Sequence, residues 1–460
     1  MSHNEKQNET YFTSDITPSL QNQTNLFQFS KETLTDAKTT LNDVINFARL
    51  EKRSKIGSIK NLEQIKLDDE QIKSSTGIVE FDKNGFVGEI RWWAFYPSEG
   101  GEKPPIIALH GGPSFNHKYM LPLKLMAYPE FGGYPVIFYD QCGCGGSTTI
   151  TPSIASREKG EKKEVSTSAT SQDIPPHLFT VEYYVEEFLH LLHCWNTSKN
   201  YPISFKNGYY LYGSSWGTIL AQEVAVHLRE TVDKYQTDGT TRIAKLPKLM
   251  GLFLDGALSD AQLYCKSQWK YRISRMPSFT YHLLHELEVL ARENDSVDKK
   301  EKANENLEPD PAINIYETKT YKQIERVLSS MFTTRLVPLP DFWKDCLAGA
   351  NMEIYSKMQG ASEFTIGGCL KHWSIVNRLP CLSKDTSLKE GDESFVVKAP
   401  LPVLALAGEF DTMTIECHQN VLDSIGGGDT NKLVVIPRAG HCKLVDEPLA
   451  CCEAVLEFMK

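Results

Sequence analysis

The stretch Tyr209–Leu228, YYLYGSSWGTILAQEVAVHL, decides the fold of this chain. An apolar run leads into GSSWG and an amphipathic segment follows, which predicts a strand, a sharp turn and a helix. GSSWG fits G-x-S-x-G in one register only, and that register centres on Ser215. Such a turn exposes the hydroxyl of its central serine, so the pattern predicts Ser215 as a nucleophile and Ser214 as its neighbour. A turn that happens to contain serine is the alternative.

Further apolar runs, rich in Ile, Val, Leu and Tyr, each end at a glycine-rich or polar corner. They span 104–112, 134–141, 208–215, 249–256, 401–411 and 432–441. Continuous runs of this kind are typical of strands buried on both faces of a parallel sheet. Amphipathic segments at 181–195 and 218–228 predict helices between the strands. The sequence therefore predicts an α/β fold.

The apolar runs also divide the 460-residue chain. Residues 1–75 are polar, with helical spacing between 30 and 50, and are interpreted as an extension. Residues 76–258 and 399–460 form the two parts of an α/β core. Residues 259–398 lack a buried strand pattern, so we expect a helical cap inserted in that core, with polar linkers at 294–310 and 383–394. A charged, Ser/Thr-rich stretch at 156–173 predicts a surface loop.

A nucleophilic serine needs a base and a group that orients the base. Asp411 follows the apolar run that begins at 401, and His441 follows the last run. The chain order Ser215, Asp411, His441 is the α/β-hydrolase order, and functional groups collect at the carboxyl ends of parallel strands. We expect His441 to accept the Ser215 proton and Asp411 to fix the imidazole tautomer. For a histidine considered alone, a structural role is the alternative.

The segment His110–Ser114, HGGPS, supplies the next candidate feature. It follows a strand, and tight glycine turns expose backbone N–H groups of the kind that an oxyanion hole requires. Gly112 and Trp216 are the candidate donors. An ordinary Gly-Pro turn without a catalytic role is the alternative interpretation of this segment.

Composition narrows the function classes. The net charge is −10 and no Lys/Arg-rich run occurs, which argues against nucleic acid as a partner. No apolar run is long enough for a membrane span, and the N-terminus has no signal-peptide pattern, so a cytoplasmic location is expected. The eleven cysteines suit reduced, mostly buried thiols. Cys142 or Cys144 could instead be a reactive thiol.

HGGPS, YDQCGCGGS, GSSWG, GEFD and AGH, in this order, resemble the motifs of the proline iminopeptidase family of α/β hydrolases. The resemblance covers residues 76–460 and includes 358–379. It implies an eight-stranded sheet with a helical cap after the sixth strand, and a serine exopeptidase that releases an N-terminal residue, proline or another, from short peptides. It implies no cofactor and no metal. It also implies that Glu363 binds the substrate's free α-amine.

The chain departs from the family pattern at three positions. Thr412 stands where some members carry a second acid, Ser114 replaces the last glycine of HGGPG, and Thr218 replaces the second glycine after Trp216. A strict preference for proline therefore does not follow. An amino acid amidase or esterase with the same three residues stays open, as does a non-catalytic binding protein of the same fold.

Overall fold

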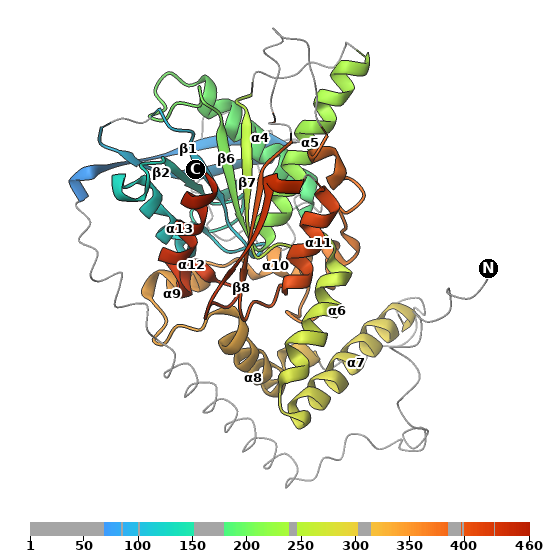
Figure 1. Cartoon of the computed structure of the whole chain (residues 1–460). Coiled ribbons are helices and arrows are strands. Elements are labelled where there is room, and N and C mark those ends of the chain that lie inside the picture. Colours follow the sequence, from blue (N-terminus) through green and yellow to red (C-terminus); the bar gives the residue numbers. More distant parts are fainter. Residues whose placement is uncertain are drawn as a thin grey trace, which may run out of the picture. The chain divides into compact units, whose positions relative to one another are not determined.

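The computed structural model describes residues 69–83, 86–99, 102–150, 179–238, 246–301, 314–384, 397, 400–426 and 428–460. The expected helix between 30 and 50, the loop at 156–173 and most of the linker at 383–394 lie outside these residues. Figure 1 shows a central sheet between two groups of helices, with further helices below it.

The sheet contains nine strands, eight of which lie side by side. They are β1 (Ile72–Lys83), β2 (Phe86–Pro97), β3 (Ile106–Leu109), β4 (Val136–Tyr139), β5 (Thr148–Ile150), β6 (Tyr209–Ser214), β7 (Leu249–Asp255), β8 (Val403–Gly408) and β9 (Asn431–Ile436). The order is β1-β2-β4-β3-β6-β7-β8-β9, and β5 pairs with β2. The strands from β4 to β9 in this order pair in parallel, whereas β2 pairs antiparallel with β1, β4 and β5. The predicted mostly parallel sheet is confirmed.

Each of the six predicted apolar runs contains a strand. The runs did not reveal β1 and β2, because β1 is a long edge strand of polar and partly exposed residues. The expectation of burial on both faces was wrong for β9, whose residues are mostly half-buried or exposed. This strand forms the other edge of the sheet, so no neighbour covers its far side.

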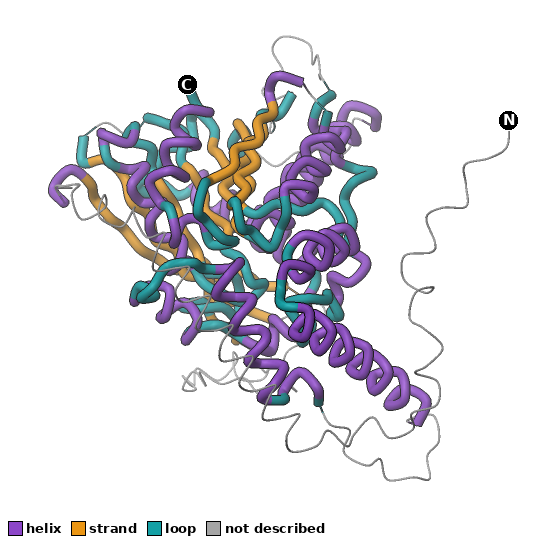
Figure 2. Tube along the Cα trace, turned by 60° about the horizontal axis from the view of Figure 1, so that its bottom comes forward, coloured by secondary structure: helices purple, strands orange, loops and turns teal. Residues whose placement is uncertain are grey.

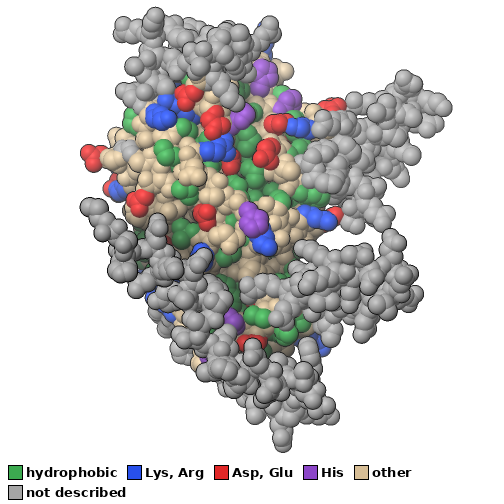
Figure 3. All heavy atoms as spheres, turned by 90° about the vertical axis from the view of Figure 1, so that its right-hand side faces the viewer, with side chains coloured by type: hydrophobic (Ala, Val, Ile, Leu, Met, Phe, Trp, Pro, Cys, Tyr) green, Lys and Arg blue, Asp and Glu red, His purple; other side chains and the backbone are tan. Residues whose placement is uncertain are grey.

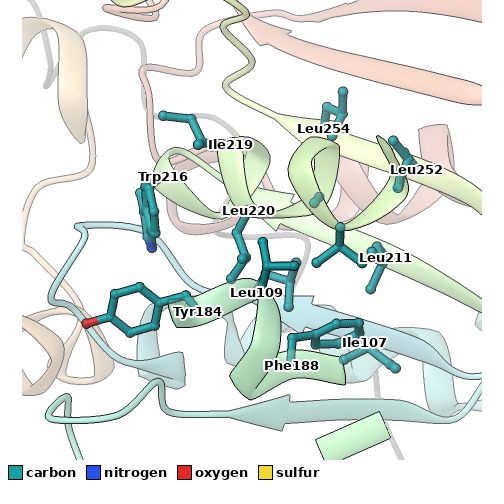
Figure 4. Close-up of a cluster of buried hydrophobic side chains, with 14 of the residues drawn as sticks. Ile107, Leu109, Tyr184, Phe188, Leu211, Trp216, Ile219, Leu220, Leu252 and Leu254 are labelled. Atoms are coloured by element: carbon teal, nitrogen blue, oxygen red, sulfur yellow. The ribbon is translucent and has the colours of Figure 1, made fainter. Parts of the chain in front are cut away.

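Helices cover both faces of the sheet. They are α4 (Val181–Thr197), α5 (Trp216–Asp238), α11 (Ile415–Ile425), α12 (Lys443–Asp446) and α13 (Pro448–Phe458). Figure 4 shows Tyr184 and Phe188 of α4 and Leu220 of α5 packed around Leu109 and Leu211 of the strands beneath. A second apolar cluster lies on the other face and includes residues of α12 and α13. The two clusters fix the sheet between its helices.

The segment between β7 and β8 is helical. It contains α6 (Ala261–Tyr271), α7 (Ser278–Glu301), α8 (Lys319–Leu328), α9 (Asp341–Ala348) and α10 (Met352–Met358). Figure 2 shows helices and no strands at the lower right of the molecule, the side on which α7 lies in Figure 1. The predicted linker at 294–310 was wrong in part, because α7 continues to Glu301. Its charged residues are compatible with a helix, and charge alone does not end one. No described helix is both long and apolar enough to cross a bilayer.

Candidate active site

Ser215 stands in the turn between β6 and α5. Its φ of 56° lies in the left-handed region, which residues with a Cβ rarely adopt. The turn requires glycine on both sides. A Cβ on Gly213 would lie 2.2 Å from the carbonyl oxygen of Gly217, and a Cβ on Gly217 would lie 2.0 Å from the carbonyl oxygen of Leu109. Ser215 is partly exposed while Ser214 is buried, so the turn presents the first of these to solvent.

The HGGPS loop lies against this turn. A Cβ on Gly111 would come within 2.8 Å of the Ser215 Cβ, so a side chain at this position would collide with the serine. Gly112 follows with a φ of 121° and lines the same pocket as Ser215. Trp216 is the first residue of α5, where backbone N–H groups have no acceptor within the helix. The structure thus brings both predicted oxyanion donors to one pocket.

Gln141 of the DQCGCGGS motif connects the two loops. Its side-chain Nε2 donates to the carbonyl oxygen of His110 at 2.9 Å, and its Oε1 accepts from Trp216 Nε1 at 2.8 Å. Its backbone N–H donates to His110 Nε2 at 2.9 Å. Burial lowers the pKa of His110, which suits a neutral ring that accepts this bond. The three motifs therefore meet through hydrogen bonds that support the serine turn.

His441 and Asp411 are in direct contact. His441 Nδ1 lies 2.7 Å from Asp411 Oδ1, which also accepts the backbone N–H of Met413 at 2.8 Å. Burial by itself would raise the pKa of Asp411, but the charge of Lys443, followed by that of His441, holds it well below its usual range. An ionised Asp411 accepts a hydrogen bond from Nδ1–H, which leaves Nε2 as the nitrogen available to a substrate.

One pocket brings together the serine turn, His441 and the candidate oxyanion donors. It encloses about 750 Å³, its open mouth included, and Ser214, Ser215 and His441 line it together with Gly112 and Trp216. Side chains from the helical segment between β7 and β8 line it as well. The apolar part of its wall consists of Ile219, Leu258, Ile366 and Leu370. The pocket therefore joins an apolar wall to a few polar groups, as small-molecule sites usually do.

Glu363 also lines this pocket, and the open mouth leaves its side chain reachable by solvent. Tyr355 donates a hydrogen bond from its hydroxyl to Glu363 Oε1. Protein atoms crowd the carboxyl group, and this loss of hydration raises its pKa, although Tyr355 and His441 act in the opposite direction. Thr412 lies in the same lining. The structure therefore places both the predicted amine ligand and the site of the missing acid in the pocket.

Sequence reasoning did not identify three further residues around these groups. Tyr355 holds Glu363, and Lys443 contacts Asp411. Glu325 of α8 accepts the backbone N–H of Glu363, and loss of hydration, followed by repulsion from Glu363, raises its pKa to about 7. No motif signals Tyr355 or Glu325, because only the folded cap brings them to Glu363. Lys443 stands two residues after His441, and that proximity was the available signal.

None of the eleven cysteines forms a disulfide, and seven of them are buried. Burial raises the pKa of the Cys142 and Cys144 thiols, and neither residue lines the pocket. A high pKa disfavours the thiolate that a reactive cysteine needs. The described residues include no group of three or more His, Cys, Asp or Glu side chains that could hold a metal ion.

Comparison with known proteins gives one consistent result. No family model matches the chain. A curated proline iminopeptidase of Thermoplasma volcanium is 26% identical over 361 residues, which cover 78% of this chain and 90% of that protein. A second curated proline iminopeptidase, from Flavobacterium johnsoniae, is 25% identical over 379 residues, which cover 81% of this chain and 95% of that protein.

Solved structures agree with the fold. The crystal structure of VinJ shares 19% identity at a TM-score of 0.57 and covers 83% of this chain and 98% of its own. The crystal structure of the proline iminopeptidase of Mycobacterium smegmatis shares 20% identity at a TM-score of 0.54, and the match covers 83% of this chain and 97% of that one. The sheet order and these solved structures show the α/β-hydrolase fold, and the chain is similar over 78–81% of its length to the curated proline iminopeptidases.

Proposed function

We propose that this chain is a serine exopeptidase that releases an N-terminal residue, proline or another, from short peptides through an acyl-enzyme. One observation carries the proposal. Ser215, in a strained turn at a helix N-terminus, shares a pocket with His441, which is hydrogen-bonded to Asp411. A nucleophile, a base and an orienting carboxylate in this order are what acyl transfer requires. The similarity to curated proline iminopeptidases supports the same reaction class.

The reaction begins with Ser215. Its Oγ attacks the carbonyl carbon of the first peptide bond while His441 Nε2 takes the hydroxyl proton. The negative charge that develops on the carbonyl oxygen is stabilised by the backbone N–H groups of Gly112 and Trp216. His441 then gives the proton to the departing nitrogen, the C–N bond breaks, and the shortened peptide leaves. The released residue remains as an ester on Ser215.

Water completes the cycle. His441 takes a proton from a water molecule, whose oxygen attacks the ester carbonyl carbon. The ester bond to Ser215 breaks, the serine oxygen recovers its proton from His441, and the free amino acid departs. Asp411 remains ionised throughout and stabilises the imidazolium that forms in each half of the reaction. No redox step or external co-reactant other than water is needed.

Glu363 would restrict this chemistry to the first bond. A carboxylate that faces the pocket favours the α-ammonium of a substrate through a charge-assisted hydrogen bond. The raised pKa values of Glu363 and Glu325 suit groups that gain stability when a cation arrives beside them. Thr412 adds no charge there, so amine recognition would depend on Glu363 and its neighbours rather than on a second acid at 412.

The test uses two substrates that differ in one group. An aminoacyl arylamide with a free amine should be hydrolysed, and its N-acetyl form should be hydrolysed far more slowly. A fluorophosphonate should label wild type at Ser215. Equal turnover of both substrates would replace the exopeptidase by an amidase or esterase without amine recognition. Absence of both turnover and labelling would indicate a binding protein.

We also infer a cytoplasmic location. The eleven cysteines support it, because buried thiols without disulfides suit a reducing compartment. Fractionation of source cells with an antibody against the chain tests this point, and recovery from a secreted fraction would contradict it.

A further inference from the structure

Lys443 is a lysine with no exposed side-chain surface. It is the first residue of α12, two positions after His441. Its Nζ lies 2.5 Å from Asp411 Oδ2 and 2.9 Å from Asp255 Oδ1, and it donates to the carbonyl oxygen of His441 at 3.0 Å. A buried ammonium is stable only with such partners, because burial otherwise opposes its charge.

Asp255 gives this cluster a second negative charge. It ends β7, is 1% exposed, and accepts a hydrogen bond from the Tyr212 hydroxyl at 3.0 Å. Asp255 and Asp411 therefore carry two buried charges, and Lys443 supplies one positive charge between them. With a neutral His441 the group has a net charge of −1, and with a protonated His441 it is neutral.

We propose that Lys443 is a positioning residue, which balances Asp255 and holds Asp411 Oδ2 so that Oδ1 faces His441. This inference rests on the proposed function, in which His441 is the base. The two oxygens of the Asp411 carboxylate have different partners: Oδ2 faces Lys443, and Oδ1 faces the imidazole of His441. Two fixed oxygens define the plane of the carboxyl group, and that plane directs the imidazole.

Charge gives Lys443 a second effect on the same base. A positive charge beside Asp411 makes protonation of His441 less favourable than two unbalanced carboxylates would. The imidazole therefore stays neutral, and able to accept the Ser215 proton, down to a lower pH. Without Lys443, the carboxylates of Asp255 and Asp411 would together favour the imidazolium and delay formation of the active base.

Other titratable groups face this cluster from the elements packed around it. They are Tyr212 of β6, Arg272 of α6, Glu363 of the cap, Cys417 and His418 of α11, Cys442 beside His441, Cys451 of α13 and Glu409 after β8. His418 donates from Nδ1 to the carbonyl oxygen of Thr414, and its Nε2 accepts the backbone N–H of Ala257, so it is neutral. Arg272 donates to the backbone oxygens of Asp411 and Glu409 rather than to a carboxylate of the cluster.

The test compares Lys443→Met, Asp255→Asn and the double variant, with Lys432→Met as the control. Lys432 lies on β9 and pairs with Glu457 on the exposed surface, so the control removes a lysine charge outside the cluster. Two quantities are measured for each protein. One is the pH midpoint of the acid limb of kcat/KM, and the other is the midpoint of the His441 ring titration followed by NMR.

Lys443→Met should move both midpoints to higher pH by about one unit or more, since a full charge is lost within a few ångströms. It should also lower kcat at the high-pH plateau more than it changes KM. Asp255→Asn should move the midpoints to lower pH, because Lys443 then faces Asp411 alone. The double variant restores the net charge of −1 and should lie between the two. Lys432→Met should match wild type.

The inference is overturned if the two single variants leave the midpoints unchanged or move them in the same direction. If Lys443→Met fails to fold, the other two variants still test the inference. The pH midpoints of Asp255→Asn must be lower than those of wild type, and those of the double variant must be higher than those of Asp255→Asn. The NMR titration does not depend on turnover. A protein without Ser215-dependent activity would refute the proposed function, whereas an active one with unmoved midpoints would refute only the role of Lys443.

Discussion

At the scale of single residues, Ser214 and Ser215 differ in backbone conformation and in exposure. Ser215 takes the left-handed conformation and is partly exposed, while Ser214 is the last residue of β6 and is buried. Ser215→Ala should therefore lower kcat by about 10⁴-fold or more, as loss of a triad serine does. Ser214→Ala is the matched control and should retain most of the turnover. Normal turnover in Ser215→Ala, or a fluorophosphonate adduct on Ser214, would show that the assignment is wrong.

Glu363 allows a second experiment at this scale. Glu363→Gln keeps the shape of the side chain and its contact with Tyr355 but removes the charge. Loss of this charge-assisted contact in the pocket should raise the activation free energy that kcat/KM reports by about 2–4 kcal/mol for substrates with a free amine. The N-acetyl substrate should be affected little. Glu286→Gln, on the exposed surface of α7, provides the control.

The comparison of substrates decides what Glu363 does. Equal damage to both substrates would mean that Glu363 supports the cap rather than the amine. Thr412→Glu, which adds a carboxylate to the same pocket lining, should improve binding of the free amine. A weaker binding of the amine in that variant would mean that position 412 does not face it.

At the scale of elements, the contact between α5 and β3 determines the geometry of the serine turn. Gly217 of α5 passes so close to Leu109 that an added Cβ would lie 2.0 Å from its carbonyl oxygen. Gly217→Ala should displace the start of the helix and with it the N–H of Trp216. We expect a loss of about 1–3 kcal/mol or more in unfolding free energy and a large fall in kcat.

A second glycine provides the control for this element. A Cβ on Gly367, in the loop that carries Glu363, would meet no atom within 4 Å. Gly367→Ala should therefore change neither stability nor kcat by much. Thermal unfolding and turnover of the two alanine variants test the pair, and similar behaviour of both would show that close packing at the serine turn is not what position 217 requires.

At the scale of the whole molecule, both the surface seen in Figure 3 and the interior carry charged groups. In the view of Figure 3, the described side chains of both charge signs alternate with apolar ones, without a patch of one sign. The interior also holds carboxyl groups that the mechanism does not use, and Glu187 is one of them. Glu187 of α4 is fully buried, accepts the backbone N–H of Cys142 at 2.9 Å, and has no hydrogen-bond partner at Oε1 among the described residues.

Glu187 should make the stability of the fold depend on pH. Burial raises its pKa to about 8 in the folded protein, while the unfolded chain has the ordinary value of about 4.3. The folded state therefore holds this proton more tightly, and stability falls as the pH rises between these two values. Glu187→Gln removes the charge, so it should raise unfolding free energy at pH 9 by on the order of 2 kcal/mol and change it much less at pH 5.

Chemical denaturation at the two pH values measures this difference. Glu186→Gln is the matched control, because the adjacent side chain is exposed and pairs with Lys83 at the surface. A Glu187→Gln variant with the same stability difference at both pH values would contradict the titration of a buried carboxyl group.

The sequence by itself determined what local pattern can determine. Continuous apolar runs located β3, β4, β6, β7 and β8, whose residues are mostly buried, and the last run located the less buried edge strand β9. Ser215 followed from the spacing of its glycines, because only glycine tolerates the contacts of that turn. The order of Ser215, Asp411 and His441 predicted the fold, and the structure places Ser215 and His441 in one pocket, with Asp411 hydrogen-bonded to His441. Their catalytic roles stay predictions.

The tertiary structure decided the features that depend on distance through space. The edge strand β1 lacks the buried pattern, so its pairing with β2 defines it. Tyr355 and Glu325 reach Glu363 only through packing within the inserted helical segment, and no local pattern encodes that approach. In the sequence, nothing distinguishes Lys443 from an ordinary surface lysine. It is buried because Asp255 at the end of β7 and Asp411 in the loop after β8 meet it there, and buried charge is stable only where opposite charges converge.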